Sequence, residues 1–387
     1  MKQILSLFGL VFIAITSFNS VLSSDTECPN ILSNNILSTL NPKPMSTLAS
    51  ISSDRRENNS TLRLVQYNVE WLFIDYCTSS DCPGNGCTWK NSTEAETHLQ
   101  YVTSVIDKLN PDIINFCEIE GCDELNILAQ QLQTTQTTQT TQTNPMKQTN
   151  PMKQTNSYIP YLKKGTDTST GQNVGMLTRI DPVVNLYRDE SRVEYPIFGS
   201  KCNYNGLAST SGSSKHYITE FKISDINIAL IGVHFVAIPT DPSRCAQREA
   251  QAQVIQNNIY SYIEKGYEVI VLGDMNDFDG EILDVNSNKP KSYVLDILKG
   301  SYGTYQNKYS LISSASHIDQ SQRYSDWYDS DNNCKTSSIK DYSMIDHVLL
   351  TPNLNDKITN MFIHHEYEEY CGKYNSDHYP VVIDFKF

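Results

Sequence analysis

Two kinds of apolar segment alternate along most of this chain, and this alternation restricts its fold more than any other feature. Short runs such as 62–69, rich in β-branched and aromatic residues, predict strands, whereas the apolar side chains within 94–109 recur at the spacing of a helix. Several predicted strands follow one another without a helix between them, so the sheets are expected to be mixed. The pattern predicts one large α/β domain over residues 62–387. The other strand-like runs are 112–116, 174–177, 183–187, 217–223, 226–233, 268–272, 344–350 and 381–387, and the other helical ones are 125–132, 244–264 and 292–298.

The residues before this domain are of a different character. Residues 1–23 combine Lys2, an almost wholly apolar run over 4–15 and small residues near position 23, which is typical of a secretory signal peptide. The apolar run is too short to span a bilayer, so no stable membrane anchor is expected. Residues 24–60 are rich in Ser, Asn and Thr without periodicity, which predicts a flexible leader. We therefore expect a secreted, extracellular protein.

A repetitive tract interrupts the predicted domain. Residues 133–156 read QTTQTTQTTQTNPMKQTNPMKQTN, a three-residue repeat that passes into a six-residue one. Such a polar tract buries too little apolar surface to offset the entropy of ordering its backbone. It predicts a disordered surface loop inserted in the domain, which a fold tolerates because loop-closure entropy grows slowly with length.

Cysteine and sequon usage agree with export. An even number of cysteines in an exported chain predicts disulfides. The cluster Cys77, Cys82 and Cys87 also allows a zinc site, but it lacks the paired CxxC spacing and nearby His ligands. The ten cysteines are at positions 28, 77, 82, 87, 117, 122, 202, 245, 334 and 371. N-x-S/T sequons, which predict glycosylation, begin at Asn58, Asn59 and Asn91.

The chain is acidic, with 30 basic and 44 acidic side chains and a net charge of -14. A protein that holds nucleic acid by bulk electrostatics usually carries a basic face, so this balance argues against that class. It leaves room for an enzyme that meets phosphate through a bound metal, because the ion then supplies the positive charge.

Polar side chains gather at the ends of the predicted strands. Strand ends that open on one edge are where α/β proteins build their sites. Carboxylates and amides with few thiols nearby favour Mg²⁺ or Mn²⁺ over zinc, and added His residues can move protons during attack on a phosphate. Each segment alone is typical of a turn or a solvated charge, so the joint order indicates the site. The segments are 67–71, 117–120, 233–235, 273–277, 345–347 and 376–380.

In that order the segments resemble the endonuclease/exonuclease/phosphatase superfamily of metal-dependent phosphoesterases. The resemblance runs from Leu62 to Phe387 and is carried by LVQYNVEWL, PDIINFCEIE, VGMLTR, IGVHFVA, VIVLGDMNDF, MIDHVLL and SDHYPVVI. It implies a four-layer α/β (α+β) sandwich in which two mixed β-sheets are flanked by helices. It also implies a hydrolase that acts on phosphoric ester bonds by in-line attack of water.

The resemblance implies a divalent cation held by Asn68, Glu118 and Asp377, with Asn68 binding directly or through water. Mg²⁺ or Mn²⁺ is the expected catalytic ion, and Ca²⁺ remains an option as a structural ion. Glu118 is preferred to Glu120 because the preceding PDII run sets the register of the strand.

The remaining site residues take catalytic roles by the same resemblance. Asp274 would orient or deprotonate the attacking water, and Asn276 would hold the scissile phosphate. His378 would pair with Asp346 to give a polarised imidazole that contacts phosphate or transfers a proton. His234, on the opposite side, is the candidate general acid for the leaving oxygen.

Two positions depart from the family pattern. The residue before the metal-binding glutamate is usually glutamine, and here it is Cys117, for which a disulfide with Cys122 is an option. His347 beside Asp346 is unusual, and we interpret it as a supporting or structural residue.

The substrate is expected to be nucleic acid, DNA or RNA. Segments 118–132 and 247–252 and the GDMNDF ending look most like secreted bacterial-type extracellular nucleases, and no apolar hairpin suited to a lipid surface stands out. Arg192 and Arg244 are weak candidates for phosphate contacts. A sphingomyelinase-like or small-molecule phosphoesterase is the alternative, and a non-catalytic secreted binding protein is a further one. The enzyme is expected to be a monomer.

Overall fold

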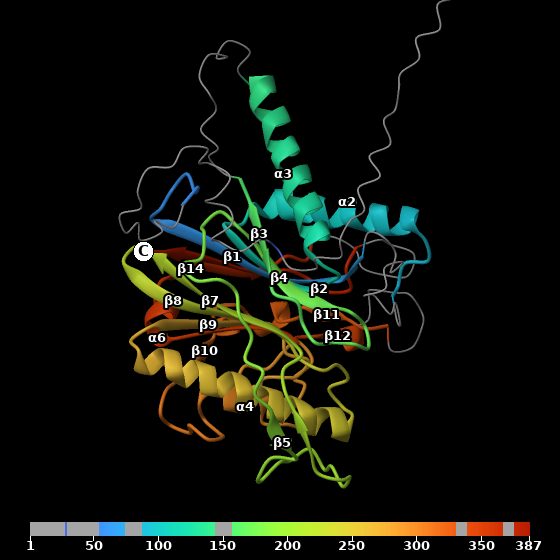
Figure 1. Cartoon of the computed structure of the whole chain (residues 1–387), viewed down its shortest axis with the longest axis vertical. Helices are drawn as coiled ribbons and strands as arrows, with labels where there is room; N and C mark the ends of the chain where they lie inside the picture. The colour runs from blue at the N-terminus through green and yellow to red at the C-terminus, as the bar shows by residue number, and fades with distance from the viewer. Residues whose placement is uncertain (1–27, 29–53, 74–86, 144–156, 330–338, 367–374) are drawn as a thin grey trace, which may run out of the picture.

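The computed structural model describes residue 28 and residues 54–73, 87–143, 157–329, 339–366 and 375–387. Two β-sheets pack face to face, and helices cover the outer face of each (Figure 1). Among the described residues, no helix is long and apolar enough to cross a membrane. The signal peptide and nearly all of the expected leader before Asp54 lie outside the described residues.

The first sheet has six strands in the order β14-β15-β1-β2-β4-β3. β1 pairs in parallel with β2 and antiparallel with β15, so the sheet is mixed. The outer face packs against helices α2 (Ser92–Leu109) and α3 (Cys122–Thr143). The strands are β1 (Thr61–Leu72), β2 (Ile113–Ile119), β3 (Ile159–Leu162), β4 (Asn173–Thr178), β14 (Ile358–Ile363) and β15 (Val381–Lys386).

The second sheet has five strands in the order β10-β13-β9-β8-β7. β8 and β9 are parallel, and the other pairs are antiparallel. Helices α4 (Pro242–Glu264) and α5 (Val294–Lys299) cover its outer face. The strands are β7 (Lys215–Ile223), β8 (Ile226–His234), β9 (Glu268–Asp274), β10 (Ile312–Ser313) and β13 (Asp346–Leu350).

Small elements complete the fold. A short helix and three turns of 3₁₀ helix lie within the second half of the chain. The two-stranded pairs are β5 (Val193–Tyr195) with β6 (Ser209–Ser211) and β11 (Asp326–Trp327) with β12 (Tyr342–Ser343). The helical pieces are Ser314–His317, Gln320–Gln322, Ile339–Asp341 and α6 (Pro352–Asn355).

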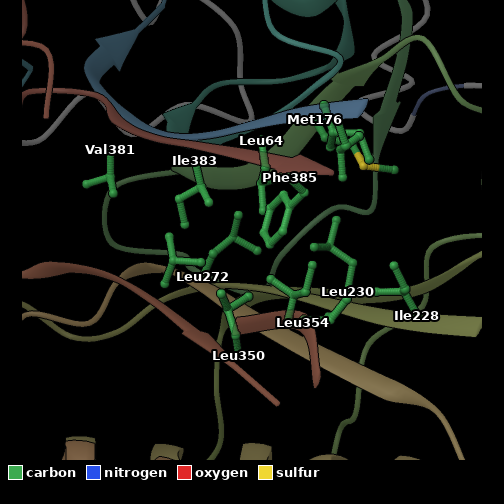
Figure 2. Packing of buried hydrophobic residues seen from close by; sticks show 14 of the residues in the cluster. Leu64, Met176, Ile228, Leu230, Leu272, Leu350, Leu354, Val381, Ile383 and Phe385 are labelled. Atoms are coloured by element: carbon green, nitrogen blue, oxygen red, sulfur yellow. The ribbon is translucent and has the colours of Figure 1, made fainter. Parts of the chain in front are cut away.

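The main core lies between the two sheets. Leu64 and Phe385 of the first sheet face Leu230, Leu272 and Leu350 of the second (Figure 2). Strands that are buried on both faces read as nearly continuous apolar runs, which is why the sequence marks them so clearly. A second core lies between the first sheet and helices α2 and α3, and a third lies between the second sheet and helices α4 and α5. The expected four-layer fold class is therefore confirmed.

Two local expectations differ from the structure. Residues 133–143 of the repeat tract continue α3 instead of forming a loop. The first turns of the helix pack through the buried side chains of Leu125, Leu128 and Leu132, and Gln and Thr residues continue it to Thr143. Pro145 follows two residues later in the sequence, and the helical conformation is unfavourable for the residue before a proline. The rest of the tract lies outside the described residues. The expected strand 183–187 forms only an isolated bridge from Tyr187 to Ile218.

Disulfides join Cys28 to Cys122 and Cys202 to Cys245. The optional pairing of Cys117 with Cys122 is wrong. Cys117 lies in the core between the sheets, whereas Cys122 starts α3 on the outer face, where Cys28 also packs. Most of the Cys77, Cys82 and Cys87 cluster lies outside the described residues.

Candidate active site

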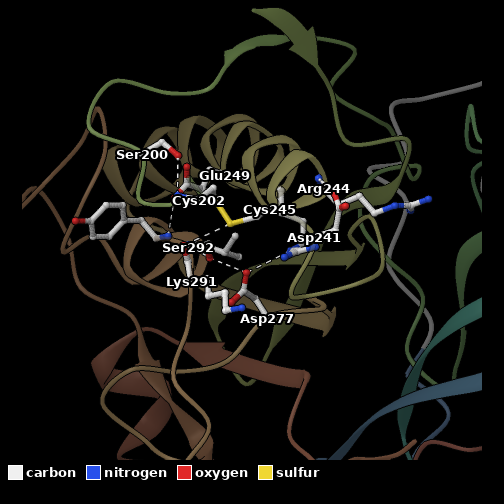
Figure 3. The surroundings of a disulfide bond; sticks show 12 residues. Ser200, Cys202, Asp241, Arg244, Cys245, Glu249, Asp277, Lys291 and Ser292 are labelled. Carbon is white, nitrogen blue, oxygen red and sulfur yellow. Dashed lines mark hydrogen bonds and ion pairs between the residues drawn. A yellow bond between two sulfur atoms is a disulfide. The ribbon is translucent and has the colours of Figure 1, made fainter. Parts of the chain in front are cut away.

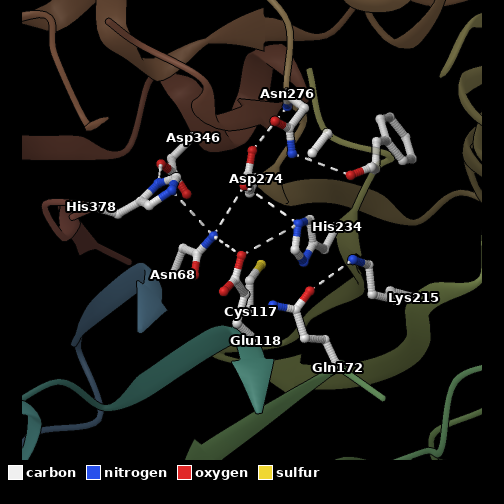
Figure 4. A network of polar contacts seen from close by, with 12 residues as sticks. Asn68, Cys117, Glu118, Gln172, Lys215, His234, Asp274, Asn276, Asp346 and His378 are labelled. Carbon is white, nitrogen blue, oxygen red and sulfur yellow. Dashed lines mark hydrogen bonds and ion pairs between the residues drawn. The ribbon is translucent and has the colours of Figure 1, made fainter. Parts of the chain in front are cut away.

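The strands bring the predicted polar segments to one end of the sandwich. His234 ends β8 directly beside Asp274 at the end of β9, and Asp346 begins β13 on the other side of Asp274. In the facing sheet, Asn68 of β1 pairs in register with Cys117 of β2. Figure 4 shows these side chains turned toward a common centre between the two sheets.

Irregular backbone directs side chains into this centre. The pairing of β1 with β2 shifts register after Asn68, and Glu118 has a φ of 69°. Gly273 has a φ of 149°, and a Cβ at this position would lie 1.8 Å from the carbonyl oxygen of Val233. Only glycine fits this close approach of β8 and β9, which places Asp274 at the end of its strand.

The Asn68 side chain lies at the middle of the cluster and is fully buried. Its Nδ2 atom lies 3.2 Å from Oε1 of Glu118, 3.0 Å from Oδ2 of Asp274 and 3.3 Å from Nε2 of His378. Its Oδ1 accepts a hydrogen bond from the backbone N–H of Glu70. One amide therefore contacts groups that come from both sheets.

His378 forms an ion pair with Asp346. The distance from Nδ1 of His378 to Oδ2 of Asp346 is 2.6 Å, and Ser325 donates a further hydrogen bond to the same oxygen at 3.0 Å. Burial by itself would lower the pKa of His378, but the Asp346 carboxylate raises this pKa well above its ordinary value. The contact with Asp346 therefore favours the protonated form of His378.

The pKa of His234 is shifted the other way. Its Nε2 atom lies 3.5 Å from Oδ2 of Asp274 and 3.8 Å from Oε1 of Glu118. Burial, helped by the positive charges of Lys215 and His378, holds the pKa of His234 well below its usual range. Its Nδ1 has no hydrogen-bond partner among the described residues. The pKa values of the two histidines of this site are thus shifted in opposite directions.

Among the described residues, acidic and histidine side chains form two sets, and within each set the ligand atoms lie within 4.8 Å of one another. Burial, with the nearby charges of Asp346 and Glu118, raises the pKa of Asp274 to about 8. A divalent cation would relieve such crowding, and carboxylate oxygens are ligands that Mg²⁺ prefers, so the residues fit the expected ion. Glu118 and Asp377, two of its predicted ligands, fall in different sets. The sets are Glu118 with His234 and Asp274, and Asp326 with Asp377 and His378.

The loops behind the site are held by a buried arginine. Arg248 of α4 is fully buried and lies 3.2 Å from Oδ2 of Asp277, next to Asn276. It also donates to the carbonyls of Val236, Ile238 and Pro239, which follow His234 in the chain. Figure 3 shows Asp277 of this network near the Cys202–Cys245 disulfide. α4 thereby fixes the loops after β8 and β9.

Other predicted residues lie near or outside the cluster. The Asn276 side chain donates to the carbonyl of Phe235 at 3.2 Å, close to His234. His347 lies 2.9 Å from the carbonyl oxygen of Asp277, consistent with a structural residue.

The two arginines predicted to contact phosphate, Arg192 and Arg244, are exposed. Arg192 donates to Thr210 on β6, whereas Arg244 lies in the first turn of α4. The sequon residues Asn58, Asn59 and Asn91 are also exposed, which suits a glycan acceptor.

Sequence reasoning missed several polar residues of the site. Glu70 accepts a hydrogen bond from the backbone N–H of Asp377, and Asp326 lies 3.7 Å from Nε2 of His378. Lys215 pairs in register with His234, and its ammonium donates to Gln172 at 3.1 Å. Their signals in the sequence are weak because Asp326 lies in a two-residue strand and Lys215 starts a strand that otherwise looks like core.

Solved structures of similar fold include a truncated TDP2 from Caenorhabditis elegans, 15% identical with a TM-score of 0.46 over 84% of this chain and 98% of that one. An AP endonuclease from Archaeoglobus fulgidus is 12% identical, with a TM-score of 0.48 over 84% and 99%. An endonuclease/exonuclease/phosphatase from Beutenbergia cavernae is 13% identical, with a TM-score of 0.48 over 84% and 72%. No protein-family model and no curated protein matches the chain.

Proposed function

We propose that this protein is a secreted, divalent-metal-dependent phosphodiesterase and that its substrate is DNA or RNA. The single observation that carries the proposal is the convergence of carboxylates and two histidines from both sheets around the buried Asn68 amide. The Asn68 side chain contacts His378 on one side and Asp274, which lies next to His234, on the other. Hydrolysis of a phosphodiester needs a group that accepts a proton from water and groups that stabilise or protonate the phosphate oxygens, and carboxylates and histidines can fill these parts.

Each residue has a proposed part in that reaction. Glu118, Asn68 and Asp377 would hold a bound Mg²⁺ or Mn²⁺. The ion would neutralise charge on the phosphoryl oxygens. Asp274, at the end of β9 beside His234, would orient or deprotonate the attacking water. His378 would contact a phosphoryl oxygen with its protonated ring.

His234 is proposed to protonate the leaving oxygen. A bound phosphodiester brings negative charge beside the ring, which raises the pKa of the histidine and lets it take up the proton it later gives away. Asn276, at the turn after Asp274, would hold the phosphate by its amide. Lys215, buried next to His234 and ion-paired with Asp167 at 3.6 Å, is a cation that could contribute to attracting the substrate.

One observation favours the second candidate, a lipid phosphodiester. Phe198 is 100% exposed and Leu207 is 89% exposed on the segment between β5 and β6. The Cys202–Cys245 disulfide ties that segment to α4. Exposed apolar side chains on an anchored segment suit contact with a lipid surface, although the sequence alone did not mark this segment.

The test of the proposal uses bis(p-nitrophenyl) phosphate, a phosphodiester with no base and no lipid. The mature protein should release nitrophenolate with Mg²⁺ and stop when EDTA is added. Plasmid DNA, single-stranded RNA and sphingomyelin vesicles, supplied at matched phosphodiester concentration, then separate the substrates. Faster cleavage of sphingomyelin than of either nucleic acid would replace the nuclease proposal by the lipid one. Absence of turnover on all four substrates by the folded protein would overturn both.

A further inference from the structure

A chain of buried amides leads from the interior of the first sheet to the Asp346–His378 pair. Gln66 of β1 donates from Nε2 to Oδ1 of Asp346 at 3.0 Å, across the space between the sheets. Asn115 of β2, the register partner of Gln66, donates in turn to Oε1 of Gln66. Both amides are fully buried. Hydrogen bonds through Gln66 therefore join the two sheets next to the Asp346–His378 pair.

The second hydrogen of the Gln66 amide points to Cys117. Nε2 of Gln66 lies 3.6 Å from Sγ of Cys117, which itself lies 3.4 Å from the carbonyl oxygen of Val233. Burial raises the pKa of the Cys117 thiol well above its ordinary value, so the sulfur is neutral. All hydrogen-bonding atoms of the Gln66 side chain are thus engaged, and its orientation is fixed.

The packing around Asn115 is adapted to its buried amide. A Cβ at Gly232 of β8 would lie 2.4 Å from Oδ1 of Asn115 and 2.5 Å from the Tyr217 ring. Oδ1 of Asn115 and the hydroxyl of Tyr217 have no hydrogen-bond partner among the described residues. Burying amides in an apolar core is unfavourable unless they are well bonded, and an apolar pair would fill this space without that penalty. Stability alone therefore does not account for Gln66 and Asn115.

We propose that Gln66, supported by Asn115, is a positioning residue for the catalytic pair. The bond from Gln66 holds Oδ1 of Asp346, so the carboxylate cannot rotate and Oδ2 stays directed at Nδ1 of His378. Ser325 fixes the same carboxylate from the other side. The role rests on the proposed function, because it matters for catalysis only if His378 acts on a phosphodiester. A ring held in this way meets its substrate without reorganising.

The test compares Gln66→Met and Asn115→Ala with a matched control. Methionine has nearly the length of glutamine but cannot donate, and Asn115→Ala removes the support while Gln66 stays in place. Tyr217→Phe is the control, since it alters a buried polar atom of the same region outside the amide chain. On bis(p-nitrophenyl) phosphate we expect kcat to fall about 10- to 100-fold in Gln66→Met, less in Asn115→Ala, with KM within about twofold of wild type. Tyr217→Phe should keep wild-type kcat.

A second measurement does not depend on activity. The proton between His378 and Asp346 should give a low-field ¹H resonance in protein labelled with ¹⁵N-histidine, assigned by its loss in His378→Ala. We expect this resonance to move upfield or broaden in Gln66→Met and Asn115→Ala and to stay in place in Tyr217→Phe. A role confined to stability would lower the melting temperature and leave the resonance and kcat of the folded fraction unchanged.

The outcomes separate the two proposals. If wild type hydrolyses no phosphodiester while the resonance shifts in the variants, the proposed function fails but the positioning by Gln66 stands. Wild-type kcat together with an unmoved resonance in Gln66→Met overturns the positioning role. If Gln66→Met does not fold, the same two readouts on Asn115→Ala decide, and their lack of change overturns it equally.

Discussion

His378 and Asp346 form their 2.6 Å hydrogen bond across the sandwich, because Asp346 begins a strand of the second sheet and His378 precedes β15 of the first. The pair is therefore assembled only when the two sheets dock. The same contact holds the charge of the imidazole, since the pKa of His378 is raised by this carboxylate against the effect of burial.

Replacing Asp346 by asparagine removes that charge and keeps the shape. We expect kcat on a phosphodiester to fall about 10²- to 10⁴-fold, because the ring of His378 loses both its proton and its orientation. Steady-state kinetics with thermal unfolding measures this. Asp225→Asn, a change at a fully exposed aspartate, is the control and should leave kcat unchanged. Near-normal turnover of Asp346→Asn would contradict the proposed part of the pair.

Glu118→Gln should raise the Mg²⁺ concentration needed for half-maximal activity by about tenfold or more, because one anionic oxygen ligand is lost. A metal titration of activity, with isothermal calorimetry of Mg²⁺ binding, provides the measurement. Glu120→Gln is the matched control two residues on and should keep the wild-type metal requirement. The assignment would move to Glu120 if the two variants behaved in the reverse way.

Gly273→Ala should be among the most destabilising single changes in the described chain. Its φ of 149° is hard for an alanine, and the new Cβ would lie 1.8 Å from a backbone oxygen of Val233. We expect the free energy of unfolding to fall by more than about 3 kcal/mol, or the protein not to accumulate. Gly266→Ala is the comparison, since φ is 81° there but nothing lies within 4 Å, and about 1 kcal/mol is expected. Similar losses from both changes would contradict the account of the β8–β9 approach.

Because His216 is buried, we expect the folded protein to lose stability in mild acid. Burial, with the nearby Arg188, lowers the pKa of His216 from 6.5 to about 4, and Nε2 accepts a hydrogen bond from the backbone N–H of Asp189 at 2.9 Å. The unfolded chain takes up a proton near pH 6.5 and the folded chain does not, so stability is present above pH 6.5 and falls between there and about pH 4.

The full effect of that histidine is about 3 kcal/mol. Urea unfolding at pH 7.5, 6, 5 and 4, in wild type and in His216→Gln, measures it. Glutamine cannot titrate, so the variant should be less stable at neutral pH but should lose less on acidification. Equal slopes for the two proteins would show that other groups govern the acid sensitivity.

The sequence predicts well those features that depend on local pattern. Apolar runs mark the buried strands, and polar residues that interrupt or border these runs, such as Asn68, Asp274 and His378, do converge in space. These residues are recognisable because they interrupt an apolar run at its end, where side chains leave the core.

Local sequence pattern does not predict features that depend on contacts between distant segments. Cys122 is close to Cys117 in sequence but bonds to Cys28, because the chain leaves the core between these two cysteines. Gln66 lies in mid-strand, and only the docked second sheet gives its amide a partner in Asp346. Asp326 approaches His378 from a two-residue strand that no periodicity reveals.

The central claim is tested most directly by incubating the purified mature protein with supercoiled plasmid, with Mg²⁺ and with EDTA, beside His378→Ala. The account predicts that wild type converts the plasmid to nicked circles only with the metal. It also predicts that His378→Ala, folded by circular dichroism, loses at least about 99% of that activity. An intact plasmid with metal-loaded, folded wild type, or equal nicking by His378→Ala, would contradict it.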